Sequence, residues 1–233
     1  MNIFSGCRIL VVAAHPDDEI LGCGGTLAWA IDCGAIVSVL FLGEGIAARF
    51  PYGKTDNKDY MEQSEKRLCE SKAAMACLGI EDVNYGTRLC GQFDELPLIT
   101  IVKDIESHIA RVNPDILFTH NSSEVNIDHR ITYEAVEVAC RPTRDDVPSA
   151  IYSFEIICSG GYKIATTFNP NVFIDIEKYW DKKMEAWHCY SGEARPFPFP
   201  RSDEGLGMLA GYRGIQSNLK LSEAFKLERL IVK

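Results

Sequence analysis

The sequence lacks the features of several protein classes. Its 24 basic residues are outnumbered by 33 acidic ones, which gives a formal net charge of −9. An acidic surface disfavours nucleic acid and anionic membranes as partners. The hydrophobic fraction of 46% is ordinary, and no apolar run reaches the length of a membrane-spanning helix. We therefore expect neither nucleic-acid binding nor a membrane span.

Disulfide and secretion signals are also absent. Nine cysteines occur, an odd number, and no two of them are spaced as C-x-x-C. The first 15 residues lack a basic region followed by a long apolar core and a small-residue cleavage site. These absences predict a cytoplasmic protein with reduced, mostly buried thiols.

The hydrophobic pattern of the first 142 residues predicts a parallel α/β sheet. Short apolar runs rich in β-branched residues predict buried strands at 8–14, 37–42, 83–85 and 115–119. Between and after them, helices are expected at 26–34, 60–78, 98–109 and 129–139. Strands that alternate with helices are typical of a doubly wound sheet with right-handed crossovers.

The pattern loosens after Pro142. Strands are expected at 151–157 and 172–176, and a helix at 179–190. Two short helices, near 204–213 and 222–230, would end the chain. A length of 233 residues fits one domain, with a core at 1–142 and a smaller β/α extension at 143–233.

One cluster of ionisable residues directly follows the first strand. Residues 15–19 read His-Pro-Asp-Asp-Glu. The carboxyl ends of strands are where open α/β sheets bind ligands, and imidazole with carboxylates suits a divalent metal, zinc first. The alternative is a solvated polar turn whose aspartates favour the start of a helix.

A second cluster, Asn-Ile-Asp-His-Arg at 126–130, follows the strand at 115–119 and opens a helix. It should therefore lie on the same edge of the sheet and add an imidazole and a carboxylate from a distant part of the chain. In the alternative, Asp128 caps the helix and His129 is a surface residue.

These residues carry a resemblance to a known family. The segment VVAAHPDDEILGCGGTLA at 11–28 resembles the signature of the PIG-L/LmbE-like N-acetylglucosaminyl deacetylases, and N-x-D-H-R at 126–130 resembles their second motif. Weaker similarity at Arg67 and Glu70, and at the Pro-Arg-Ser of 200–202, extends it over nearly the whole chain. The resemblance implies a Rossmann-like three-layer fold with a mostly parallel sheet.

The resemblance also implies roles for particular residues. His15, Asp18 and His129 would hold Zn²⁺ or another divalent metal. Asp17 would be the general base that removes an acetyl group from an N-acetylated sugar or its conjugate. Asp128 would support Asp17 or a ligand histidine. The family further implies a homo-oligomer, a trimer or hexamer.

The chain departs from the family pattern at two positions. Asn126 and Phe199 stand where histidines are common in the family. An asparagine amide still donates a hydrogen bond but carries no charge. The resemblance implies that a histidine at position 126 would help to hold the oxyanion or the leaving group. His120, at the end of a neighbouring strand, could take over this helper role. The resemblance also implies that Arg67 contacts the sugar, and Asp94 could reach it. The alternatives are an arginine on a helix surface and a loop aspartate.

Two rival interpretations remain. The Gly22–Gly25 run after a strand suggests a nucleotide-binding oxidoreductase, but it is not G-x-G-x-x-G and carries charges where a pyrophosphate would approach. The other rival is a metal-binding protein with lost or altered activity. Asp17 argues against it, because a site that only binds metal needs no spare base.

Overall fold

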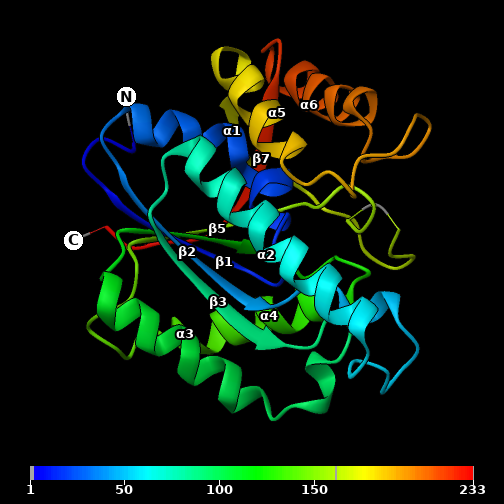
Figure 1. Cartoon of the computed structure of the whole chain (residues 1–233). Coiled ribbons are helices and arrows are strands. Elements are labelled where there is room, and N and C mark those ends of the chain that lie inside the picture. The colour runs from blue at the N-terminus through cyan, green and yellow to red at the C-terminus, as the bar shows by residue number, and fades with distance from the viewer. Residues whose placement is uncertain (1–2, 161, 233) are drawn as a thin grey trace.

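The protein is described by a computed structural model that covers residues 3–160 and 162–232. Residues 1 and 2, the start of the segment that shows no signal-peptide pattern, therefore lie outside the description. Seven strands in the described ranges form one sheet in the order β3-β2-β1-β4-β5-β7-β6 (Figure 1). They are β1 (Arg8–Ala13), β2 (Ile36–Gly43), β3 (Asp82–Arg88), β4 (Ile116–His120), β5 (Ala150–Phe154), β6 (Val172–Asp175) and β7 (Ser222–Leu230). The first five are parallel, which confirms the predicted α/β class.

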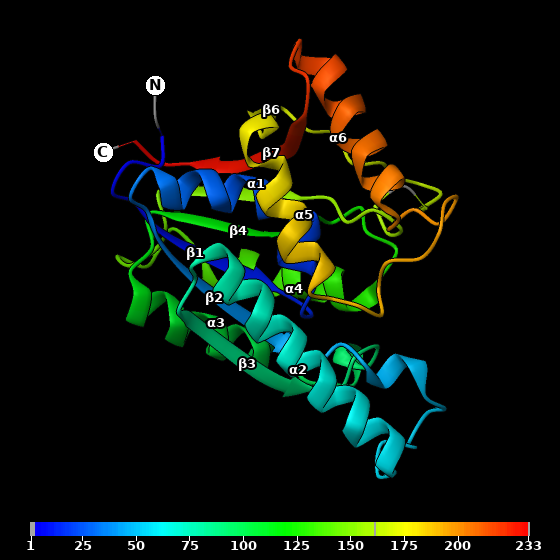
Figure 2. The ribbon, with the colours of Figure 1, turned by 45° about the horizontal axis from the view of Figure 1, so that its top comes forward.

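Helices cover both faces of this sheet and complete a three-layer arrangement (Figure 2). One face is covered by α1 (Asp18–Asp32), α2 (Lys58–Leu78) and α5 (Trp180–His188). The other is covered by α3 (Leu98–Val112) and α4 (Ile127–Ala139). The last helix, α6 (Asp203–Ser217), packs on β6 and β7. Among the described residues, none of the helices combines the length and apolar composition that a bilayer crossing requires.

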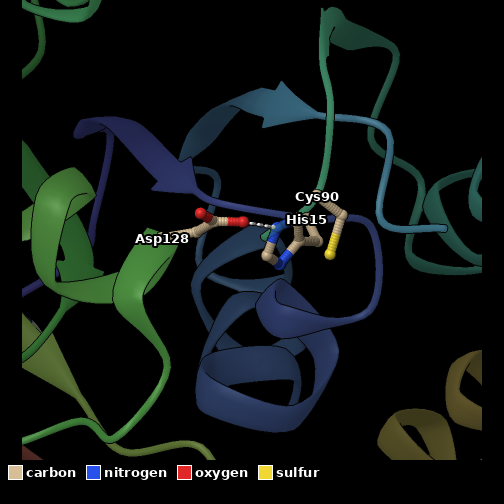
Figure 3. A group of neighbouring side chains, drawn as sticks. All are labelled: His15, Cys90 and Asp128. Carbon is tan, nitrogen blue, oxygen red and sulfur yellow. Dashed lines mark hydrogen bonds and ion pairs between the residues drawn. The ribbon is translucent and has the colours of Figure 1, made fainter. Parts of the chain in front are cut away.

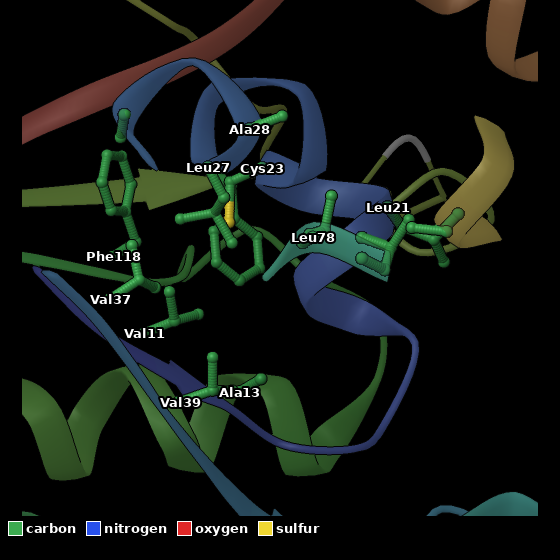
Figure 4. Packing of buried hydrophobic residues seen from close by; sticks show 14 of the residues in the cluster. Val11, Ala13, Leu21, Cys23, Leu27, Ala28, Val37, Val39, Leu78 and Phe118 are labelled. Carbon is green, nitrogen blue, oxygen red and sulfur yellow. The ribbon is translucent and has the colours of Figure 1, made fainter. Parts of the chain in front are cut away.

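Strand alternation divides the core into two apolar clusters. In β1, Val11 and Ala13 face α1 and α2, whereas Leu10 and Val12 face α3 and α4. Figure 4 shows Val11 and Ala13 on the sheet below the side chains of α1. On α3, Ile101, Ile105 and Ile109 are fully buried in the second cluster.

One predicted element is wrong. Residues 222–230, expected to be a helix, form β7, which pairs antiparallel with β5 and β6. The segment SEAFKLERL contains good helix formers, but tertiary pairing overrides such local preferences. The buried carboxylate of Glu223 also fixes the strand, because it accepts the N–H groups of Gly25 and Thr26 and pairs with Lys183 at 2.6 Å.

The glycines of the 22–25 run serve close packing of α1. A Cβ on Gly22 would lie 2.4 Å from the Phe154 ring, and one on Gly25 would lie 2.9 Å from Ile176. The backbone of α1 therefore approaches neighbouring side chains too closely for any larger residue. Close packing therefore explains Gly22 and Gly25, and no bound nucleotide phosphate is needed to explain them.

We expect Gly22→Ala to destabilise the protein by about 1–3 kcal/mol, because the added methyl overpacks the core. Urea unfolding measures the change. The matched control is Gly211→Ala in α6, where an added Cβ meets nothing within 4 Å. That variant should be neutral or stabilised by up to about 1 kcal/mol through helix propensity. Equal effects of the two substitutions would contradict this packing role.

The strand order reverses beside β1, which has β2 on one side and β4 on the other. At such a switch point the connections leave in opposite directions and open a crevice at the carboxyl ends of the strands. The 15–19 segment follows β1 and the 126–130 segment follows β4, so both face this crevice.

Candidate active site

The turn between β1 and α1 has an uncommon backbone conformation. Asp17 has φ 118°, in the left-handed region that side chains rarely adopt. Its N–H donates to the Glu19 carboxylate at 2.9 Å, and the other oxygen of Glu19 accepts the Tyr190 hydroxyl at 2.7 Å. Burial raises the pKa of Glu19 to about 8. The two hydrogen bonds of Glu19 hold this turn in its left-handed conformation and so fix where the Asp17 side chain points.

Three buried side chains bring metal-ligating atoms together. The donor atoms of His15, Asp18 and His129 all lie within 4.8 Å of one another. His15 Nδ1 is 3.6 Å from Asp18 Oδ2, and His129 Nε2 is 3.4 Å from Asp18 Oδ1. Asp18 Oδ1 is buried without a hydrogen-bond partner among the described residues. Two imidazoles and a carboxylate are a donor set that suits a catalytic zinc ion with an open position.

A carboxylate lies behind each of the two histidines. His15 Nε2–H donates to Asp128 Oδ2 at 2.8 Å, and His129 Nδ1–H donates to Glu124 Oε2 at 3.2 Å. When the imidazoles are neutral, these bonds favour protons on Nε2 of His15 and Nδ1 of His129, so that the other ring nitrogens face Asp18. Outer carboxylates of this kind orient metal-binding histidines and raise their basicity. The residues present therefore fit a divalent metal.

The electrostatics of the three side chains differ. Burial lowers the pKa of His15, but Cys90, Asp128 and Asp18 outweigh it and hold that pKa well above its usual value. Burial raises the pKa of Asp18, but His129, His120 and His15 outweigh it and hold that pKa well below its usual value. Burial and the neighbouring His120 lower the pKa of His129 to about 4. Asp18 is therefore ionised and His129 neutral near pH 7, the states in which they donate electron pairs.

Asp17 lies beside this donor set and contacts two arginines. Its Oδ2 accepts hydrogen bonds from Arg67 and from Arg201, both at 3.0 Å. Glu193 lies between the guanidinium groups and pairs with Arg67, Arg201 and Arg49. Oδ2 of Asp17 is thus hydrogen-bonded, whereas Oδ1 has no hydrogen-bond partner among the described residues.

A pocket of about 160 Å³ opens onto these groups. It is lined by His15, Asp17, Asp18, Gly45, Ala48, Arg49, Cys90, Asn126, His129 and Arg201. A second pocket of about 430 Å³ adjoins Pro16 and runs between α2 and β3. The first holds the polar chemistry, because the donor set and Asp17 face it.

The family can be assigned from the comparison with known proteins. A sequence model described as PIG-L, GlcNAc-PI de-N-acetylase, matches residues 10–140, more than half of the chain. The chain belongs to the PIG-L family. This confirms the resemblance drawn from residues 11–28 and 126–130.

Relatives of this PIG-L protein are named as deacetylases. It is 27% identical to the diacetylchitobiose deacetylase of Thermococcus kodakarensis, over 94% of this chain and 82% of the relative. It is 28% identical to the uncharacterised deacetylase YaiS of Escherichia coli, over 76% of this chain and 87% of that protein. The predicted enzyme class, an N-deacetylase, agrees with these relatives.

Solved structures share the fold. The N,N'-diacetylchitobiose deacetylase of Pyrococcus horikoshii superposes with a TM-score of 0.73, at 23% identity, over 94% of this chain and 83% of that one. The 4-carboxy-2-hydroxymuconate hydratase of Pseudomonas putida superposes with a TM-score of 0.74, at 22% identity, over 97% and 98% of the two chains. Both likenesses concern the fold alone, because the same architecture carries different reactions.

The two candidate helper residues, Asn126 and His120, lie in different environments. Asn126 lines the pocket, and its Oδ1 accepts the N–H of Asp128 at 2.9 Å. His120 is 0% exposed and does not line the pocket. Its Nε2 accepts the Ala14 N–H at 3.0 Å, and its ring stacks on His129 with centroids 4.0 Å apart. His120 therefore packs against His129, outside the residues that line the pocket.

Neither predicted sugar contact lines the pocket. Arg67 is 3% exposed and lies behind Asp17, so its guanidinium is occupied by Asp17, Glu193 and the Pro16 carbonyl. Asp94 is exposed in the short helix η2 (Phe93–Glu95), away from the pocket lining. The positions do not support direct contact with a sugar bound there. Phe199 also lies outside the lining, against Arg195.

Sequence reasoning missed several residues of the site. Glu124, Glu193 and Cys90 carry no motif, and only the folded chain brings them to His129, Arg67 and His15. Arg201 had a signal, since it belongs to the Pro-Arg-Ser run at 200–202, but its contact with Asp17 spans 184 positions of sequence.

Substitution of Arg67 distinguishes a positioning role from a substrate contact. We expect Arg67→Lys to lower kcat by up to about a hundredfold, because a point charge cannot hold both Asp17 and Glu193 and a small misplacement of the base is costly. KM for the substrate should change little. Arg111→Lys is the matched control, because that arginine pairs with Asp82 on the surface. A rise in KM with unchanged kcat would instead return Arg67 to the sugar-binding role.

Proposed function

We propose that this protein is a metal-dependent N-deacetylase that hydrolyses the acetamide group of an N-acetylated amino sugar or its conjugate. The observation that carries the proposal is the pairing, in one small pocket, of a three-donor metal set with the separate carboxylate of Asp17. A site that only stored metal would have no use for a base held by two arginines.

His15, Asp18 and His129 would hold the metal, with zinc the best match to two nitrogens and one oxygen. Zinc bound by such a set polarises a carbonyl and lowers the pKa of water to about 7. Asp128 and Glu124 keep the two imidazoles in the tautomers that binding requires.

Asp17 moves the proton of the reaction. Its Oδ2 is held by Arg67 and Arg201, so Oδ1 is free to take a proton from the attacking water. Water oxygen adds to the acetamide carbon, and the carbon–nitrogen bond then breaks. Asp17 returns the proton to the departing nitrogen, which leaves as an amine while the acetyl group leaves as acetate.

Asn126 is placed to assist at the carbonyl oxygen. Because its Oδ1 is occupied by the Asp128 N–H, its amide nitrogen is the group that remains for a bound substrate. A neutral amide donor stabilises a developing negative charge less than a protonated histidine would. We therefore expect Asn126 to give a lower rate than a histidine would, with the reaction class unchanged.

The relatives guide the choice of substrates. One is named a diacetylchitobiose deacetylase, and another, from Corynebacterium glutamicum, a 1D-myo-inositol 2-acetamido-2-deoxy-α-D-glucopyranoside deacetylase, 29% identical over 51% of this chain and 47% of its own. We propose that an acetamido sugar is the shared unit, and that the enzyme acts in the cytoplasm.

The test is a screen of N-acetylglucosamine, N,N'-diacetylchitobiose and N-acetylglucosaminyl-inositol for release of free amine. The zinc-loaded protein should release amine from at least one of them, with acetate in equal amount. Protein that binds one zinc ion tightly yet hydrolyses no acetamide would favour the alternative, a metal-binding member of the family that has lost activity.

A further inference from the structure

A second set of possible metal ligands meets at His15 from the other side. The donor atoms of His15, Cys90 and Asp128 lie within 4.8 Å of one another. Figure 3 shows the Asp128 carboxylate on one side of the imidazole and the Cys90 thiol on the other. The two sets share only His15, and they differ in chemistry, because this one contains a sulfur atom.

The backbone fixes Cys90 at this position. Its own N–H donates to the Glu44 carboxylate at 2.9 Å, and the N–H of Gly91 donates to Asp128 at 2.5 Å. Gly91 has φ 81°, a conformation that favours glycine. Asp128 also accepts the Phe93 N–H at 3.1 Å. The loop after β3 is therefore hydrogen-bonded both to Glu44, just after β2, and to Asp128, the third residue of this ligand set.

Cys90 is also reachable by ions from solution. It is half-buried and lines the same pocket as His15. By contrast, Cys23 and Cys140 are buried in the core. A thiolate, an imidazole and a carboxylate form a softer donor set than His15, Asp18 and His129, and soft ligands select thiophilic cations.

We propose that Cys90, His15 and Asp128 form a second metal site for thiophilic divalent cations such as Cd²⁺, and that this site competes with the first set for His15. A neutral imidazole carries one lone pair. In the first set Nδ1 offers it toward Asp18, while Nε2–H donates to Asp128. A cation bound by Asp128, Cys90 and His15 would take this one lone pair, which would then no longer be available to the first set.

Binding at the second site therefore removes His15 from the first. The Cys90 thiol loses its proton to solvent as the metal–sulfur bond forms. The first set keeps only Asp18 and His129. The inhibition of deacetylation that follows rests on the proposed function, whereas the binding itself does not.

Cadmium binding to the metal-free protein tests the site. Cd²⁺ is added alone, and bound metal is measured by equilibrium dialysis together with the ultraviolet thiolate-to-cadmium absorption. In Cys90→Ser the absorption of the first equivalent should disappear, and affinity should fall at least about tenfold, the lower end of what loss of a supporting group costs a metal site. Cys69→Ser, at an exposed cysteine of α2, should match the native protein. Equal affinity and absorption in the native protein and Cys90→Ser would overturn the proposal.

Cobalt tests the competition for His15. Protein loaded with one Co²⁺ has visible absorption that reports its ligands. One equivalent of Cd²⁺ should alter or abolish this spectrum in the native protein and leave it unchanged in Cys90→Ser. Cadmium bound at Cys90 with an unaltered cobalt spectrum would refute the competition. Neither readout uses catalysis, so failure of every sugar substrate would count against the proposed function alone.

Discussion

Asp17→Asn is expected to lower the rate of amine release by about 10²–10⁴-fold, the usual contribution of a general base, while the metal content stays at the native level. Asparagine has the same shape, and its carbonyl oxygen can still accept the hydrogen bonds of Arg67 and Arg201. The negative charge that pairs with the two arginines and the ability to take a proton are lost. Rates and metal content are measured on the same preparation.

The matched control for this substitution is Asp94→Asn, at an exposed aspartate outside the pocket lining. It should keep the native rate. Hydrolysis by Asp17→Asn at the native rate would mean that another group takes the proton, and the mechanism would have to be abandoned. Loss of metal from Asp17→Asn would place Asp17 among the ligands instead.

His129→Ala is expected to release the metal and with it the activity. Removal of one of three ligands should lower zinc affinity by more than the 10–100-fold that loss of an outer partner typically costs. Zinc content after dialysis against a weak chelator measures this effect. The metal-free variant should remain folded, which circular dichroism checks.

The control for His129→Ala is His188→Ala, because His188 is an exposed histidine that pairs with Asp203 on the surface. That variant should bind zinc as the native protein does. Unchanged zinc content in His129→Ala would remove His129 from the ligand set and leave a site of only two side chains.

The sheet and the meeting of the two motifs could be predicted from the sequence because both depend on local patterns. Buried parallel strands read as short apolar runs, and residues that follow such strands meet at one edge of the sheet. His15, Asp18 and His129 converge for this reason although 111 positions separate Asp18 from His129 in the sequence numbering.

Elements that depend on distant partners could not be predicted. Residues 222–230 have helical propensity, yet they become β7 because two strands pair with them. Arg67 lies on a helix that could equally have faced the pocket or the interior. Its burial depends on Glu193, whose position in a loop no periodicity reveals.

The fold alone would not have fixed the reaction. A hydratase and a deacetylase both superpose on this chain with TM-scores above 0.7. The choice between such chemistries depends on side chains, and here the carboxylate of Asp17 beside a nitrogen-rich metal set favours hydrolysis. The proposed hydrolysis therefore requires a metal ion and Asp17 to act together in one pocket.

The most direct test is to add increasing amounts of zinc to the metal-free protein. Bound metal and amine release from an N-acetylated sugar are measured in each sample. We predict no activity without metal, a rise in proportion to bound zinc, and a plateau at one ion per chain. Metal-free protein as active as the reconstituted protein would show that the reaction does not need the metal.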